Sequence, residues 1–562
     1  MQKNRLSVFF FCIYAKKSVT LQRKIICDMK KGTKITLIVL GVIFALGVAA
    51  FVCSDVLLSR FVKKEVDKSL AALPFGEASV GSIHLRLFSG TAQVNDIAFA
   101  YSPSLEIKVD RIDVGRIFYS ALLQRQIQIT DIRIVEPQAV IAFDSKHPES
   151  FLPKMEPDTN ALGKLAEFID LAELHKLKID RASLKFKDIA TGLDLAVDSV
   201  TLRVYDLAFN VQDTTFSYND SVYKLEVASF RCLLPDEPMR MEIHDVAHSD
   251  AGELTVGYTR IAHAIDKRKL GPLKKEPVTW IDMQVESVRT NPMNLVRKAL
   301  AQDLTLDELT VSVKQMDVFR DTRFQPKKPY DMPQKILMQI PMTFAINHID
   351  AAINKINVEL MSTETNVGKL QLSGVKAAVE HMSNKRGNTM YVHGGCPVDK
   401  GKAKAEMRMT MNKAGDWSVK LDAKQVNTGF MNSFIRPLVG ITSDCMIDEL
   451  KADYKGNSVD ANGTFCMLYH GLKVQVHKDD DIPYKIVTKN AGAINSAANT
   501  LIPKSNPSSV DVRPREYEVT WKRDEWQPFP LYLFGPCIDG VKKTMLPGLY
   551  VHKQVKNKTK KK

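Results

Sequence analysis

The chain has 562 residues, 45% of them hydrophobic and 25% charged, which is long enough to bury sizeable cores and is unlike disordered or collagen-like sequences. Its net charge of +14 lies at the two ends: residues 1–34 carry nine Lys or Arg against Asp28, giving +8, and residues 551–562 carry six Lys and no acid, giving +6. Residues 35–550 are therefore neutral, which argues against a phosphate-binding face, so no nucleic-acid partner is expected.

The first element that we predict is a membrane-spanning helix over residues 35–54. The run ITLIVLGVIFALGVAAFVC in this segment contains no charge, and a spanning helix needs roughly 20 such residues. Three lysines between residues 30 and 34 precede it, so residues 1–34 are expected in the cytoplasm and the rest of the chain outside. The absence of a small-residue cleavage pattern favours an uncleaved anchor. MKKGTK, from Met29, is typical of a bacterial anchor, so Met29 is a candidate first residue.

A repeated strand pattern follows the anchor. Ile107 and Val109 alternate with polar residues, and after Asp110 the apolar residues resume on the opposite parity. Three further segments repeat this arrangement, around Asp131, Asp180 and Asp198. A three-residue apolar step inside a period-two pattern requires a turn or a bulge if both halves are to bury the same face. The aspartates at these steps are therefore expected to be structural rather than catalytic.

Helices are predicted to be few in the body of the chain. We predict helices from apolar residues at helical spacing, from helix-capping residues or from runs of small residues. They lie at residues 57–73, 161–176, 291–300, 427–440 and 491–501. Alternating patterns place further strands at residues 305–318, 336–351, 354–360, 367–379, 403–411 and 418–423. Residues 445–476 are expected to form two or three strands, with turns at Lys455-Gly456-Asn457 and at Asn462-Gly463. The fold class is therefore mainly β.

No motif of a known catalytic class is present in the body. G-x-S-x-G, H-E-x-x-H, a Walker loop and G-x-G-x-x-G are all missing. His393-Gly394-Gly395 resembles an oxyanion loop only superficially, and we interpret it as a glycine turn. His470 and His477 are expected to be surface or partly buried side chains. We therefore predict no catalytic, cofactor-binding or metal-binding residues, no cofactor and no enzymatic activity.

The cysteines and the C-terminal segment leave alternatives open. Cys445 and Cys466 would face each other across a predicted hairpin, so a disulfide between them is one option in an oxidising compartment. An aromatic segment is expected either to dock on the end of the sheet, which we favour, or to lie at a membrane interface; it contains Trp521, Trp526, Phe529, Tyr532 and Phe534. The C-terminal lysines are interpreted as a solvated tail, with contact to anionic lipid as the alternative.

Several segments in one order behind a single anchor resemble the AsmA-like family of envelope-biogenesis proteins. In the N-terminal half these are SIHLRLFSGTAQVNDIAF, LEIKVDRIDVG and IFYSALLQRQIQITDIRIVEPQAVIAF, over residues 82–143. In the C-terminal half the match covers residues 431–476, with Gly463, Tyr469 and the run GLKV from Gly471. Together they extend over most of the chain.

The resemblance implies a Gram-negative inner-membrane protein with its bulk in the periplasm. It implies an elongated, twisted, antiparallel-rich sheet forming a groove, with a β region at residues 55–300, a second at residues 301–490 and a final segment at residues 491–562. The apolar concave face, with Ile107 and Val200 pointing inward, would carry phospholipid acyl chains toward the outer membrane. The expected partners are phospholipid, the inner membrane through residues 35–54, and outer-membrane or envelope proteins. The alternative is a scaffold for outer-membrane protein assembly that binds envelope proteins along its sheet edges.

Overall fold

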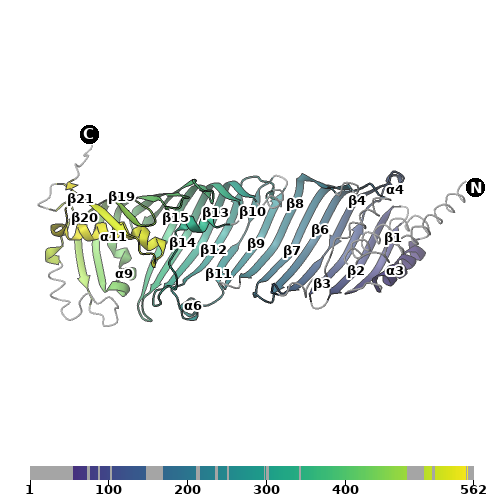
Figure 1. The fold of residues 1–562 in the computed structure, drawn as a ribbon, viewed down its shortest axis with the longest axis horizontal. Coiled ribbons are helices and arrows are strands. Elements are labelled where there is room, and N and C mark those ends of the chain that lie inside the picture. The colour runs from purple at the N-terminus through teal and green to yellow at the C-terminus, as the bar shows by residue number, and fades with distance from the viewer. Residues whose placement is uncertain are drawn as a thin grey trace, which may run out of the picture. The chain divides into compact units, whose positions relative to one another are not determined.

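Figure 1 shows the computed structural model of the chain. It describes residues 55–71, 76–86, 89–101, 104–146, 169–210, 215–234, 238–249, 252–295, 298, 303–340, 343–477, 499–508, 513–551 and 553–554. The predicted spanning helix at residues 35–54, the predicted cytoplasmic segment and most of the lysine tail lie outside these residues. Within them, no helix is both long enough and apolar enough to cross a membrane.

The chain divides into two units, residues 1–256 and residues 257–562. Each unit contains a large mixed sheet and few short helices, so the mainly β class is confirmed. The predicted boundary between two β regions, after residue 300, falls inside the second unit.

Unit 1, residues 1–256, consists of ten described strands and two described helices. The helices are α3 (Asp55–Ala71) and α4 (Tyr119–Leu122). The strands are β1 (Glu77–Arg86), β2 (Thr91–Tyr101), β3 (Leu105–Val114), β4 (Gln126–Val135), β5 (Gln138–Phe143), β6 (Leu171–Asp188), β7 (Asp194–Asn210), β8 (Thr215–Leu234), β9 (Met239–Ser249) and β10 (Leu254–Val256). Strands β6, β7, β8 and β9 lie side by side as antiparallel neighbours (Figure 1).

Strands β4 and β5 lie in one line between β3 and β6. Both pair antiparallel with β3 and parallel with β6, and Glu136-Pro137 separates them. Glu136 has a φ of 50°, and Pro137 lacks a backbone N–H donor, so the ladder is interrupted at this point. On either side of this interruption, β4 and β5 each stay in register with both β3 and β6.

The helix predicted at residues 161–176 is wrong over its described part. Residues 171–176 begin β6, where Ala172 and Leu174 pair with Ile127 and Ile129 of β4, and residues 161–168 lie outside the described residues. The apolar residues of this stretch fit both a helical and a strand pattern. Parallel pairing with β4 decides between the two, and the local sequence does not report this pairing.

The bulges predicted at the aspartate steps are confirmed around Asp180 and Asp198. The register between β6 and β7 shifts there, and the residues after the aspartates, Arg181 and Ser199, have φ values of 55° and 56°. The Asp180 carboxylate accepts hydrogen bonds from Arg133 Nε at 2.6 Å and pairs with Lys178 Nζ at 3.0 Å. Burial alone would raise the pKa of Asp180, but these two cations together lower it. The aspartate thus has a structural role, as predicted.

Asp188 ends β6 and holds the turn that leads to β7. Its Oδ2 accepts the Thr191 hydroxyl at 2.6 Å, and its Oδ1 accepts the backbone N–H groups of Ser145 at 3.1 Å and Ala190 at 3.0 Å. The hydrogen bond from Thr191, with those from Ser145 and Ala190, holds the pKa of Asp188 well below its usual range.

We expect Asp188→Asn to weaken unit 1 at neutral pH and to weaken it less in acid. Because the pKa of Asp188 is lower in the folded state than the unfolded value of about 3.9, its ionised carboxylate stabilises the fold above about pH 4, and this contribution is lost as the pH falls toward the folded pKa. Urea unfolding followed by circular dichroism at pH 7 and pH 3 measures the difference between variant and wild type. A difference that does not shrink in acid would contradict the assignment.

Unit 2, residues 257–562, contains the remaining strands. They are β11 (Thr259–His263), β12 (Thr279–Thr290), β13 (Asp303–Asp321), β14 (Thr343–Met361), β15 (Val367–Ser383), β16 (Thr389–Val398), β17 (Gly401–Thr410), β18 (Trp417–Asn427), β19 (Ile441–Gly456), β20 (Asp460–Val476), β21 (Arg515–Lys522) and β22 (Lys553–Gln554). Consecutive strands pair antiparallel, except that β13 and β14 are parallel. The helices are α6 (Lys267–Lys274), α8 (Pro333–Met338), α9 (Asn432–Val439), α11 (Phe529–Met545), η2 (Thr428–Met431) and η3 (Pro547–Leu549).

Three predictions for the second half of the chain are wrong. His393-Gly394-Gly395 is not a turn but lies inside β16, where Gly394 pairs with Ala377 and Ala405 on the two flanking strands. Residues 336–338 belong to α8, and the two strands predicted between residues 336 and 360 are the single strand β14. Asn462-Gly463 lies inside β20, because the hairpin turns at residues 457–459.

Other local predictions agree with the structure. The helical stretch at residues 427–440 forms η2 and α9, and Gly440 ends α9 with a φ of 71°. The helix predicted at residues 57–73 is α3. Within the helix predicted at residues 291–300, the Lys298 N–H donates to the Asn294 carbonyl at 3.1 Å, which is the i to i−4 hydrogen bond of an α-helix. Of the stretch at residues 491–501, only residues 499–501 are described, and they are helical.

The main core of unit 2 lies under α11. The Trp417 ring packs edge-on against Tyr454, Phe529 and Tyr532, with centroid distances of 5.9, 5.9 and 5.4 Å. Trp521 packs against the same core. The C-terminal aromatic segment therefore docks on the sheet, which confirms the favoured prediction for these residues. Trp526 and Phe534 differ, because both are exposed.

Candidate functional site

The sheet of unit 1 presents one continuous apolar face. Residues that pair across neighbouring strands point to the same side of a sheet, so the register traces each row. Three rows run through the sheet: Phe99–Ile107–Ala139–Leu184–Val197–Phe230–Ile243, Tyr101–Leu105–Ile141–Phe186–Leu195–Cys232–Met241, and Val94–Ile112–Ile134–Ile179–Leu202–Leu225. We call this surface the apolar face of unit 1. At about 4.8 Å per strand, its first row is roughly 29 Å long.

The opposite side of the same sheet is charged. One row of paired residues reads Asp113–Arg133–Lys178–Arg203–Lys224. A second row, Lys185–Ala196–Arg231–Glu242, crosses β6 to β9. We call this side the charged face of unit 1. The two faces therefore differ sharply in polarity, as expected when only one side of a sheet holds apolar groups.

The apolar face of unit 1 is covered by a helix at its first strands. There, Val62 and Val66 of α3 pack with Ile83 and Leu85 of β1 in a buried cluster. Farther along, most side chains of the rows are only half-buried. Among the described residues, no helix makes extensive contact with β6 to β9. The rows on these strands therefore form an apolar surface that no described helix covers.

Ile107 and Val200 both lie on the apolar face of unit 1. Ile107 belongs to the first row. Val200 pairs with Ala182, which has the same parity on β6 as Leu184, and with Val227 on β8. The two residues therefore share one face of the sheet, and their inward orientation in a groove stays a prediction.

Unit 2 has an apolar face of its own. Two of its rows are Ile281–Val318–Val358–Leu370 and Met283–Met316–Ile356–Leu372. A third row, Ile349–Val379–Val392–Met407–Val419–Tyr454–Gly463–Val519, runs to β21 and enters the core. Residues of α11 and of the segment around α8 cover this core, whereas the rows on β12 to β15 are mostly half-buried.

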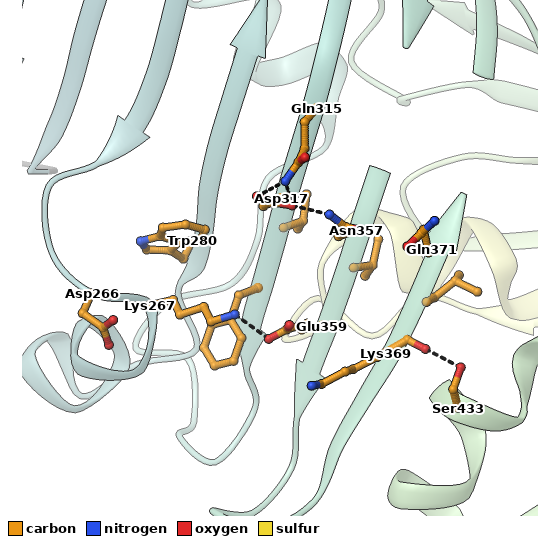
Figure 2. Close-up of a pocket in the computed structure, with 14 residues that line it drawn as sticks. Asp266, Lys267, Trp280, Gln315, Asp317, Asn357, Glu359, Lys369, Gln371 and Ser433 are labelled. Atoms are coloured by element: carbon orange, nitrogen blue, oxygen red, sulfur yellow. Dashed lines mark hydrogen bonds and ion pairs between the residues drawn. The ribbon is translucent and has the colours of Figure 1, made fainter. Parts of the chain in front are cut away.

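A polar cleft of about 560 Å³ lies on the other side of β13 to β15. Its floor is the row Asp317–Asn357–Gln371, as Figure 2 shows. The Asp317 carboxylate accepts Asn357 Nδ2 at 2.6 Å and Gln315 Nε2 at 2.8 Å, and Lys267 Nζ donates to Glu359 Oε2 at 2.7 Å. The Lys267–Glu359 pair therefore joins α6 to β14, while the polar groups of the floor bond to one another within the sheet.

The histidines singled out in the sequence do not form a common site. His470 Nδ1 lies 2.8 Å from an Asp448 carboxylate oxygen at the surface, and His477 Nε2 lies 2.8 Å from the Thr442 hydroxyl. Across the described segments, no three His, Cys, Asp or Glu side chains are placed to hold a metal ion.

A disulfide between Cys445 and Cys466 is contradicted. Cys466 pairs with Lys451, which is six residues from Cys445 along β19, or roughly 20 Å at about 3.4 Å per residue. A disulfide needs Cα atoms within about 7 Å. Both thiols are free and buried, and burial raises the pKa of Cys466 to about 11, so its reactive thiolate is disfavoured.

No model of a known protein family matches the sequence, and no curated protein matches it significantly. The resemblance to the AsmA-like family therefore stays a prediction that rests on the motifs described above.

Proposed function

We propose that the chain is a membrane-anchored periplasmic protein of the AsmA-like kind that carries phospholipid between the inner and outer membranes. The acyl chains would lie along the apolar sheet faces while the head groups stay in water. The observation that supports this proposal is the run of half-exposed apolar rows on β6 to β9 of unit 1. Residues 35–54 would anchor the chain in the inner membrane with its N-terminus inside.

The size and chemistry of the apolar face of unit 1 fit an acyl chain. One leaflet of a bilayer contributes about 15 Å, half of a hydrocarbon core of about 30 Å, so a row of roughly 29 Å is long enough to hold one chain. Moving each methylene from water to an apolar surface contributes about 0.8 kcal/mol. Because many side chains share this contact, no single residue dominates the binding, and no catalytic group is needed.

The alternative, a scaffold that binds envelope proteins by strand addition, needs an open sheet edge. The edge of β21 is partly closed by α11. Asp539 Oδ2 accepts the Thr520 N–H at 3.1 Å, and Lys543 Nζ donates to the Glu518 carbonyl at 2.9 Å. Asp539 and Lys543 also pair with each other at 2.7 Å. This pairing leaves fewer backbone groups for strand addition at β21.

We expect the double variant Asp539→Ala, Lys543→Ala to self-associate more than wild type, because it frees two backbone groups on the edge of β21. Light scattering of the full chain in detergent at increasing concentration measures this change. Lys522→Ala, Glu525→Ala, which removes one exposed charge of each sign nearby, serves as the control. An unchanged molar mass for the double variant would show that these side chains do not protect the edge.

Mass spectrometry of the purified full chain separates the two functions. The amount of phospholipid in organic extracts of the chain is compared with the amount extracted from an unrelated single-anchor protein handled in the same detergent. A larger amount from the chain would support lipid carriage. Extracts without this excess, together with an envelope protein bound in stoichiometric amount, would favour the scaffold.

A further inference from the structure

Helix α11 has a second apolar face that its packing on the sheet does not use. The inner face is buried through Tyr532, Pro536, Gly540 and Thr544. Leu531, Phe534, Ile538 and Val541 are 47%, 51%, 52% and 36% exposed. At 100° per residue, these four side chains form one stripe roughly opposite the inner face. The stripe is defined by these four residues and is called the outer stripe.

The position of Gly540 fixes the orientation of α11. A Cβ atom at Gly540 would overlap the ring of Phe465, which is fully buried in β20. The Tyr532 hydroxyl donates to the Asn457 carbonyl at 3.0 Å, and the Asp539–Lys543 pair binds the backbone of β21. The helix therefore cannot rotate the outer stripe toward the sheet without losing these contacts.

The exposed charge on α11 itself is basic. The one acid of α11, Asp539, is paired with Lys543 and with the β21 backbone, whereas Lys542 is exposed beside Val541. The sequence then continues to its end with six lysines and no acid over residues 551–562. An apolar stripe bordered by cations is the pattern of helices that lie in the interface of anionic membranes.

We propose that α11 docks unit 2 on the surface of a bilayer that carries anionic head groups, with the outer stripe entering the interface. The lysines attract the surface, and the four apolar side chains leave water there. This contact is separate from the predicted anchor at residues 35–54, and it does not require lipid to move along the apolar face of unit 1.

For the test, the full chain is held in nanodiscs and mixed with liposomes. The fraction of the chain that floats with the liposomes is measured. Liposomes of phosphatidylethanolamine and phosphatidylglycerol are compared with liposomes of phosphatidylcholine alone. We expect wild type to float with the anionic liposomes, and Phe534→Asp or Ile538→Asp, each made separately, to reduce the bound fraction at least about tenfold. Leu273→Asp, at a residue of α6 that is 65% exposed, serves as the matched control and should bind like wild type.

Equal flotation of both stripe variants and wild type would overturn the proposal. Binding that depends on salt but ignores the stripe would assign the contact to the lysines alone, which also overturns it. Binding of wild type to neither liposome would do the same. Phospholipid bound to the apolar face of unit 1 is measured separately in extracts, and we expect Phe534→Asp to leave it unchanged, so failure of membrane docking is distinct from failure of lipid carriage.

Discussion

Val200→Asp is expected to leave the chain folded and to lower the phospholipid recovered with it at least about tenfold. Val200 lies between Ala182 and Val227 on the apolar face of unit 1, where its side chain is half-buried. A carboxylate at this position would have to lose water to let an acyl chain pass, which is costly for a charge. Loss of contact for only two methylenes, about 1.6 kcal/mol, already corresponds to roughly tenfold weaker binding.

A matched control lies four residues earlier on the same strand. Ala196 is on the charged face, between Lys185 and Arg231 on the neighbouring strands, so Ala196→Asp adds the same group on the side of the sheet that already carries charged side chains. We expect this variant to keep its phospholipid. Ile107→Asp, on the first row, should behave like Val200→Asp. Phospholipid content that is equal in a folded Val200→Asp chain and in wild type would contradict the role of the apolar face.

Phe465→Ala is expected to lower the free energy of unfolding of unit 2 by about 3–5 kcal/mol, the usual cost of emptying a buried aromatic site. Phe465 is fully buried in β20, and the close approach of Gly540 leaves no room for α11 to collapse onto the gap without losing its other contacts. Urea unfolding followed by tryptophan fluorescence measures the change, because Trp417 and Trp521 lie in the same core.

The control for Phe465→Ala is Phe534→Ala, on the outer stripe of α11. Phe534 is exposed, so its removal should change the free energy of unfolding by less than about 0.5 kcal/mol. If Phe465→Ala lowers the free energy of unfolding no more than Phe534→Ala does, the packing of α11 on Phe465 does not stabilise the core.

The sequence predicts local features well where one strand or helix carries the whole signal. The parity change after Asp180 indicates a bulge because side chains alternate along any strand, and the register shift confirms it. The helix at residues 427–440 carries its own stop signal in Gly440. Gly394 and Gly395 misled the prediction because glycine usually marks a turn. Here the pairing with β15 and β17 on both sides holds them in a strand.

The candidate face could be predicted only in part. Alternation identifies Ile107 and Val200 as apolar positions, but the continuity of the rows depends on which strands pair and in what register. The parallel pairing of β4 and β5 with β6 joins the rows of β3 to those of β7, and it links residues about 45 positions apart. No local pattern reports that pairing. The spacing of Asp539 and Lys543 likewise suggests only a helical ion pair, whereas their bonds to β21 become visible in the folded chain.

The most direct measurement places a photoreactive benzophenone side chain at single positions of the full chain in living cells. Leu184 and Val197 lie on the apolar face of unit 1, and their sequence neighbours Lys185 and Ala196 lie on the charged face. After illumination, mass spectrometry of the purified chain identifies what is attached at each position. We predict phospholipid adducts at Leu184 and Val197 and only background at Lys185 and Ala196. Equal adducts on the two faces, or none on the apolar face, would contradict lipid carriage.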